Sequence, residues 1–183
     1  MEAISGSVTR NTNAFLIALL VAASLALTLG FACALPFAAF ATIAALLFDF
    51  GTAVLAILAV WLANQIVGFG FMHYPMDAST FAWGGGLGAL GLASLIAARA
   101  VLSRAHGWIA APLAFLASFA AYEGLLFAIN LAVGMDAAIF EIAVVARIFA
   151  INAAAFGALF VARALWSRTR FAQRVSVSRT RHA

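Results

Sequence analysis

The sequence has no lysine, a single cysteine and few charged residues of any kind. The absence of lysine excludes functions that need a Schiff base to a lysine side chain, such as retinal binding. A lone Cys33 cannot form a disulfide within the chain and allows no CxxC metal or redox motif. Charged residues make up 9% of the 183 residues, whereas soluble domains have about a quarter.

Hydrophobic residues account for 67% of the chain, against roughly half in a soluble domain. This surplus excludes a soluble enzyme and a nucleic-acid-binding domain, even though the net charge is +4. The first apolar run is longer than a signal peptide and has no isolated cleavage site, so we expect it to be a retained helix. The composition therefore predicts an all-α, polytopic membrane protein.

Turn-forming residues divide the apolar region into six predicted membrane helices. Pro36 separates the first two helices, and the polar run 73–80 is the clearest loop. The second helix is short, and we expect it to be tilted or partly re-entrant. The helices are predicted at 13–33, 36–49, 51–72, 81–102, 108–133 and 137–166. Residues 1–12 and 167–183 are predicted to be a cytoplasmic N-terminal segment and a basic cytoplasmic tail.

The arginines predict the orientation, because basic residues that flank membrane helices stay on the cytoplasmic side. With six spans, Arg10, Arg99 and Arg104 fall on one side together with the basic tail, whereas Asp77 and Asp136 fall on the other. Both termini are therefore expected in the cytoplasm.

Small residues form two patterns that predict helix packing. Residues 86–91 match GxGxxG, but that dinucleotide-binding motif requires a preceding strand, and here it lies inside a predicted membrane helix. Gly84, Gly88 and Gly91 are instead expected to let a neighbouring backbone approach closely. The first helix carries a stripe of small residues at four-residue spacing, Ala18, Ala22 and Ala26.

Two ionisable residues are predicted at matching depth within the membrane. Glu123 lies ten residues before the outer end of the fifth helix, and Arg147 ten residues after the outer start of the sixth. At 1.5 Å per residue, both would lie about 15 Å deep. We therefore expect an ion pair between them, which would reduce the cost of burying either charge alone. Asn130 lies two turns from Glu123, on the same helix face.

Polar and aromatic residues from other segments are predicted on the same outer side. Asn64 and Gln65 lie in the outer half of the third helix, Tyr74 in the following loop and Trp83 at the start of the fourth helix. This mixture is typical of small-molecule sites. The predicted substrate site comprises Asn64, Gln65, Tyr74, Trp83, Glu123, Asn130 and Arg147. The alternative is structural: hydrogen bonds between helices and an interfacial aromatic belt.

Catalytic motifs are missing from the sequence. It contains no GxSxG, no HExxH and no paired acidic motif. His73 and His106 are predicted on opposite sides of the membrane, which excludes a haem held by both. We therefore expect neither an enzyme nor a bound cofactor.

Its size, six spans, cytoplasmic termini, alanine stripe and polar outer half resemble the substrate-binding S components of energy-coupling-factor vitamin transporters. The resemblance implies uptake of a vitamin or vitamin precursor through the bacterial cytoplasmic (inner) membrane, with the predicted site residues holding the substrate. It also implies a transmembrane scaffold subunit, packed on the alanine stripe, and ATPase subunits, because the chain lacks a phosphate-binding GxxxxGK motif. If the substrate were cobalamin, Cys33 or His73 could reach the cobalt. No other metal site is expected.

Other partners and another function class stay open. The arginine-rich tail could bind anionic lipid or only fix the topology, and nucleic acid is not expected as a partner. The alternative function is a non-catalytic membrane scaffold or assembly subunit. Such a protein would pack against partners through its glycine- and alanine-rich helices, with Ala18, Ala22, Ala26, Gly84 and Gly88 at the contact.

Overall fold

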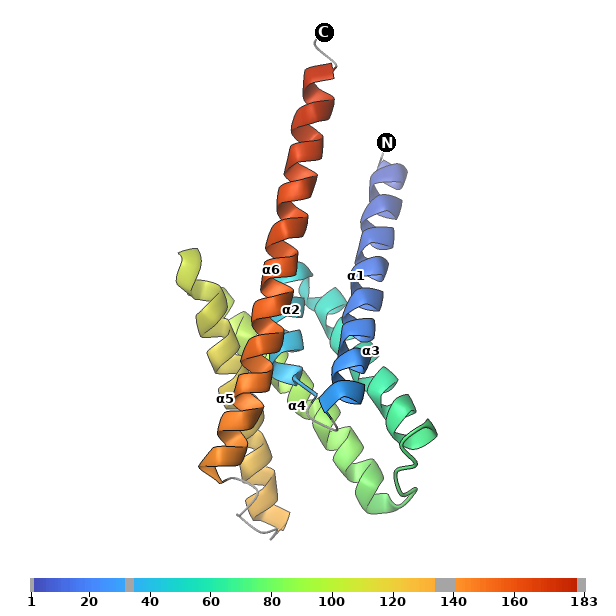
Figure 1. The fold of residues 1–183 in the computed structure, drawn as a ribbon, viewed down its shortest axis with the longest axis vertical. Coiled ribbons are helices and arrows are strands. Elements are labelled where there is room, and N and C mark those ends of the chain that lie inside the picture. Colours follow the sequence, from blue (N-terminus) through green and yellow to red (C-terminus); the bar gives the residue numbers. More distant parts are fainter. Residues whose placement is uncertain (1, 32–34, 134–140, 181–183) are drawn as a thin grey trace.

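The structure is a computed structural model that describes residues 2–31, 35–133 and 141–180, and these ranges are almost entirely helical (Figure 1). The described residues contain no strand, which confirms the predicted all-α class. The α-helices are α1 (Glu2–Phe31), α2 (Phe37–Leu47), α3 (Phe50–Gly70), α4 (Ala78–Leu102), α5 (Ala110–Val133) and α6 (Ile142–Thr180), with a 3-10 turn, η1 (Gly107–Ile109), before α5.

Five of these helices have the length and hydropathy to cross a membrane, so the chain is a polytopic helical membrane protein. The spans are Asn11–Leu29, Phe50–Gly70, Ala78–Leu102, Gly107–Val133 and Ile142–Trp166. The remaining helix, α2, has only 11 residues. It rises about 16 Å, roughly half the thickness of the hydrocarbon core. The structure thus confirms six apolar helices with a short second one, and five of the six are long enough to span the membrane.

Local capping sets where the helices begin. Asp49 precedes α3 and accepts hydrogen bonds from the Thr52 backbone at 3.0 Å and the Thr52 hydroxyl at 2.6 Å. The hydrogen bond from the hydroxyl, and to a lesser extent that from the amide, holds the pKa of Asp49 below its usual range. Helix α6 begins at Ile142, later than the predicted residue 137, and the Glu141 carbonyl accepts from the Val144 and Val145 amides.

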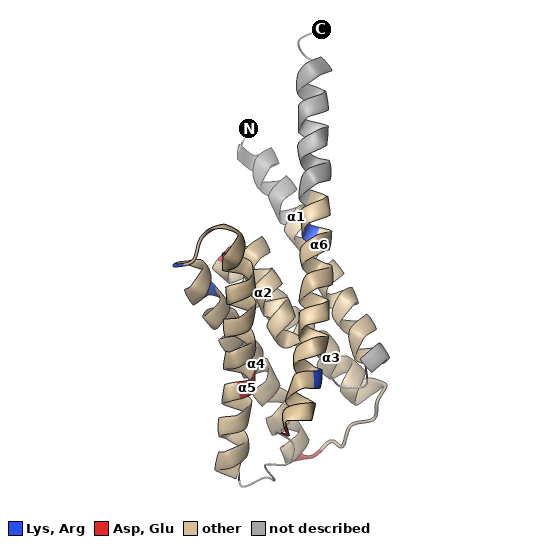
Figure 2. Ribbon diagram, turned by 60° about the vertical axis from the view of Figure 1, so that its left-hand side comes forward, with Lys and Arg blue, Asp and Glu red and all other residues tan. Residues whose placement is uncertain are grey.

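Successive helices run in opposite directions, so the two termini lie at the same end of the bundle (Figure 1). The junction between α4 and α5 lies at that end too, whereas the loop between α3 and α4 lies at the other. Most of the basic residues that Figure 2 colours lie toward the end that carries the termini. The positive-inside rule assigns this end to the cytoplasm, as predicted.

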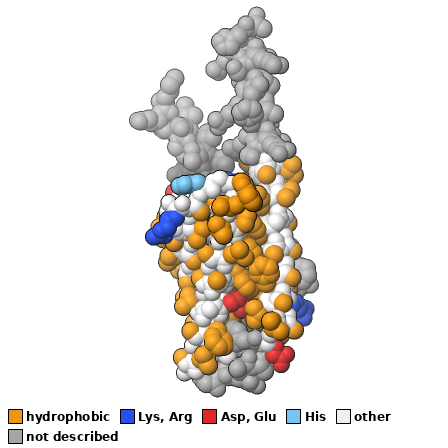
Figure 3. Space-filling view, turned by 90° about the vertical axis from the view of Figure 1, so that its left-hand side faces the viewer, with side chains coloured by type: hydrophobic (Ala, Val, Ile, Leu, Met, Phe, Trp, Pro, Cys, Tyr) orange, Lys and Arg blue, Asp and Glu red, His pale blue; other side chains and the backbone are white. Residues whose placement is uncertain are grey.

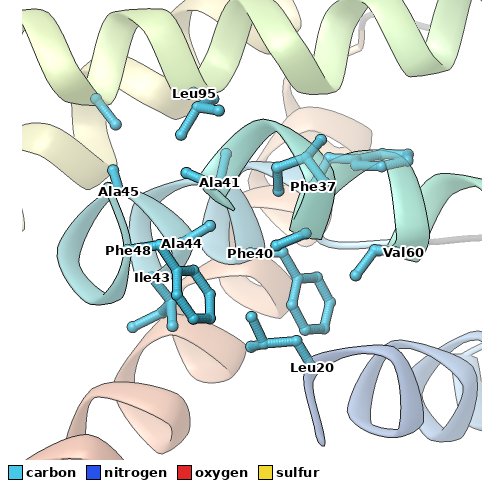
Figure 4. Close-up of a cluster of buried hydrophobic side chains, with 14 of the residues drawn as sticks. Leu20, Phe37, Phe40, Ala41, Ile43, Ala44, Ala45, Phe48, Val60 and Leu95 are labelled. Carbon is cyan, nitrogen blue, oxygen red and sulfur yellow. The ribbon is translucent and has the colours of Figure 1, made fainter. Parts of the chain in front are cut away.

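The short helix α2 is the centre of the bundle. It contacts α3, α4, α5 and α6, and every residue from Phe37 to Ala45 is buried. Figure 4 shows Leu20 of α1 on one side of α2 and Leu95 of α4 on the other, with Phe40 between them. Large hydrophobic side chains also cover the outside of the molecule (Figure 3), as expected of a surface in contact with lipid.

Polar side chains from three other helices bind the ends of α2. At its start, Asn152 of α6 accepts a hydrogen bond from the Ala39 amide at 3.3 Å, and Ser118 of α5 donates to the Ala38 carbonyl at 3.1 Å. At its end, the Arg99 guanidinium of α4 donates to the Phe48 carbonyl. The Ala39 amide lies in the first turn of α2, where it has no intrahelical acceptor, and inside a membrane Asn152 takes the place of water. A cation at a helix C-terminus also matches the helix dipole.

Replacing Asn152 by leucine should destabilise the fold, because the Ala39 amide would lose its acceptor in an apolar interior. An unsatisfied buried donor costs about 1–3 kcal/mol. The measurement is reversible unfolding of the purified protein in mixed micelles. Asn11→Leu, the same substitution at an exposed position of α1, serves as the control. Equal stability of the two variants would show that Asn152 does not hold α2.

Candidate functional site

Asn64, predicted to bind substrate, connects α3 to α1 instead. Its amide nitrogen donates to the Ser24 hydroxyl at 3.1 Å and to the Val60 carbonyl at 2.8 Å. Its oxygen accepts from the Thr28 hydroxyl at 2.5 Å. Both amide hydrogens and the oxygen therefore have protein partners, which favours the structural alternative for this residue. Ser24 and Thr28 escaped the sequence analysis, although their four-residue spacing places them on one face of α1.

Gln65 packs into a groove that the glycines of α4 leave open. A Cβ at Gly84 would lie 2.6 Å from the Gln65 side-chain oxygen, and a Cβ at Gly88 would lie 3.0 Å from the Trp61 nitrogen. The Trp61 indole also donates to the Gly84 carbonyl at 2.8 Å. Ile57 lies one turn before Trp61 on α3, and its side chain is close to where a Cβ at Gly91 would be.

The glycines of α4 do allow close packing, but the predicted occupant of the groove is wrong. The groove accepts α3 side chains at four-residue spacing, not a neighbouring backbone. Gly84 and Gly88 are buried inside this chain, so they do not form a contact surface for a partner protein. Ala18, Ala22 and Ala26 of α1 are exposed and remain available for one.

The outer loop folds back onto the end of α3. The Tyr74 amide donates to the Gly68 carbonyl at 3.1 Å, and the Tyr74 ring lies against Gly68, where a Cβ would be 2.6 Å away. His73 has a φ of 55°, in the left-handed region, and its side chain is exposed. Asp77 then caps α4 through the Thr80 amide at 2.7 Å, and this bond holds the pKa of Asp77 below its usual range.

Of the two suggested cobalt ligands, His73 lies in the exposed loop before α4. No group of three or more His, Cys, Asp or Glu residues in the part of the chain that the structure describes could hold a metal ion. Cys33, the other suggested cobalt ligand, lies outside the described residues.

Glu123 and Arg147, predicted to form an ion pair, belong to different environments. Glu123 is only 9% exposed, and one of its carboxylate oxygens has no hydrogen-bond partner among the described residues. Arg147 is exposed and faces α1. Because α6 begins at Ile142, Arg147 lies about 8 Å from the helix start, and Glu123 about 15 Å from the end of α5. The predicted depths therefore do not match, and the two side chains are not paired.

The remaining predicted residues are partly or fully enclosed. Asn130 is 2% exposed, and it is buried on α5 like Glu123, as their seven-residue spacing predicted. Trp83 is half-buried at the start of α4. Their roles in ligand binding stay predictions.

A cavity of about 690 Å³ lies between α1 and α6. Among the residues that the structure describes, Arg147 is the only ionisable or polar one that lines it. The α1 and α6 spans are the two least enclosed by the rest of the bundle, and Ala26, Ala154 and Ala158 in the cavity wall are exposed. The cavity is therefore open toward the surrounding lipid. Its apolar lining consists of Ala23, Ala26, Leu27, Ala150, Ile151, Ala154, Ala155, Ala158 and Leu159.

A smaller cavity of about 180 Å³ adjoins the first on the side of the termini. Leu159 lines both cavities, and Arg163 lines the smaller one. Phe15 of α1 and Trp166 of α6 also line it, and their rings stack with centroids 6.2 Å apart. This aromatic contact joins α1 to α6 near the cytoplasmic end.

The larger cavity is the candidate functional site, and we call it the α1–α6 cavity. It combines an apolar wall from two helices with one guanidinium, an arrangement that is usual for ligand-binding pockets. Of the seven predicted substrate residues, only Arg147 lines it. No family model, curated protein or solved structure matches this chain.

The glycine groove predicts a position-specific response to a larger side chain. Gly88→Leu should lower the free energy of unfolding by about 1–3 kcal/mol, because the new side chain would overlap Trp61. Gly85→Leu is the matched control, since a Cβ at Gly85 meets nothing within 4 Å. Unfolding in mixed micelles measures both. Similar losses at the two positions would contradict the packing of Trp61 against Gly88.

Proposed function

We propose that this protein is a membrane-embedded binding component for a small molecule that occupies the α1–α6 cavity. The observation that carries the proposal is the cavity itself. Its volume of about 690 Å³ falls within the range of about 300–1,000 Å³ that is common for ligand pockets. An apolar wall with one polar group that can orient the ligand is also usual for such sites.

The site we propose differs from the one expected from the sequence. Arg147 stays in it, whereas Asn64 and Gln65 belong to the packing of α3 against α1 and α4. Alanines of α1 and α6 take the place of the amide and aromatic residues. The ligand would therefore enter from the side of the bundle and not through the outer loops.

The biological role we propose is uptake of a small nutrient, in keeping with the resemblance to vitamin transporter S components. A vitamin or vitamin precursor would be the substrate, and the bacterial cytoplasmic membrane the location. Energy would come from ATPase subunits through a transmembrane scaffold subunit. The exposed Ala18 and Ala22 on α1 support this arrangement, since small residues allow another helix to pack closely.

The same alanines favour a second candidate, a non-catalytic scaffold or assembly subunit. In that function, a partner helix would lie against Ala18 and Ala22, and the α1–α6 cavity would hold only lipid. The two candidates differ in what remains bound to the purified protein.

The test is mass spectrometry of the small molecules that stay with the full chain in mild detergent. Ala154→Phe should remove a stoichiometric ligand, because the ring would occupy the part of the cavity beside α6, where the ligand would lie. Ala146→Phe, an exposed position of α6 outside the cavity lining, is the control and should keep it. Wild-type protein with stable protein partners but without a small molecule would favour the scaffold and contradict the binding component.

A further inference from the structure

We infer that the α1–α6 cavity takes a single-chain amphiphile with an acidic headgroup, a long-chain carboxylic acid, with its carboxylate on Arg147. This inference rests on the proposed function and specifies its ligand class. It depends on three features of the cavity as the described residues form it: an arginine without a partner among those residues, a wall in which they place no other polar group, and an opening toward lipid.

Arg147 lies where its guanidinium can bind the headgroup of such a ligand. Among the described residues it makes no ion pair with Glu123 of α5, and Glu141 lies outside the cavity lining. A guanidinium without a counter-charge near hydrocarbon is costly, so an anion beside it stabilises both groups. Helical side chains tilt toward the N-terminus of their helix. From about 8 Å inside α6, Arg147 can therefore reach the outer interface, where a headgroup would lie.

A carboxylate suits this guanidinium. The planar guanidinium donates two parallel hydrogen bonds to a carboxylate, which fixes the orientation of the bound group. One arginine matches one acidic group. A ligand with several charges would leave the others without a counter-ion in the cavity.

The rest of the cavity wall determines the rest of the ligand. Apart from Arg147, the side chains that line it are alanine, leucine or isoleucine. A ligand with hydroxyls or amides along its length would leave those groups without hydrogen bonds, which costs free energy. A hydrocarbon chain has no polar groups, so it leaves no hydrogen bond unsatisfied against this wall. It also reaches the cavity readily, because the exposed Ala26, Ala154 and Ala158 border the lipid.

The experiment uses the full chain in neutral detergent micelles and two photoreactive probes. The probes are a palmitic acid that carries a diazirine on its chain and the corresponding alcohol. We expect the acid to label α1 and α6 peptides at the cavity, with the alcohol binding about ten- to hundredfold more weakly. Loss of a charge-assisted hydrogen bond gives a change of this size.

Three variants assign the effect to the cavity. Arg147→Gln should weaken the acid about ten- to hundredfold and bring it close to the alcohol. Ala154→Phe should abolish labelling by both probes. Arg104→Gln should bind like the wild type, because Arg104 is exposed near the cytoplasmic end and donates to the Ala100 carbonyl. Arg147 is exposed without a described protein partner, so its variant should fold, which size-exclusion chromatography and the unfolding midpoint check.

Other outcomes would overturn the inference in distinct ways. If acid and alcohol label equally, or Arg147→Gln binds the acid like the wild type, the acidic headgroup is wrong. The proposed function would still stand if Ala154→Phe removed the copurified ligand. If phosphatidylglycerol vesicles displace the acid and phosphatidylcholine vesicles do not, the occupant is an anionic bilayer lipid. If Ala154→Phe changes neither measurement, both the inference and the proposed function fail.

Discussion

The architecture depends on the need to satisfy the ends of a helix that is too short to cross the membrane. Helix α2 begins within the bundle, where its first-turn amides have no water. Asn152 accepts from the free Ala39 amide and Arg99 donates to the Phe48 carbonyl, while Ser118 adds a hydrogen bond to the Ala38 carbonyl. Because these residues come from α6, α5 and α4, their contacts with α2 also fix three spans relative to one another.

This arrangement leaves α1 and α6 separated along much of their length. Helix α1 packs against α3, through Asn64 among others, whereas α6 packs against α2 and α5. The two join through the stacked rings of Phe15 and Trp166. The α1–α6 cavity lies in the space between two helices that are held by different neighbours, and its alanines keep that space wide.

The sequence predicted elements that depend on local patterns and missed contacts that depend on neighbours. The loop between the third and fourth helices and the short second helix follow from residue type and run length. The pairing of Glu123 with Arg147 failed because it relied on a helix start five residues too early. The role of Asn152 escaped notice, although a lone amide within an apolar span is itself unusual. Which alanines face a cavity depends on helix rotation, which an alanine-rich sequence does not specify.

Amide hydrogen exchange of the full chain in micelles tests the central claim most directly. If α2 is a buried helix with bound ends, the amides of Phe40–Ala45 should exchange as slowly as those in the middle of α3 and α4, since all open only when the bundle opens. The first-turn amide of Ala39 should also be protected, because Asn152 accepts its hydrogen bond. Fast exchange across α2, at the rate of the loop around His73, would contradict the account.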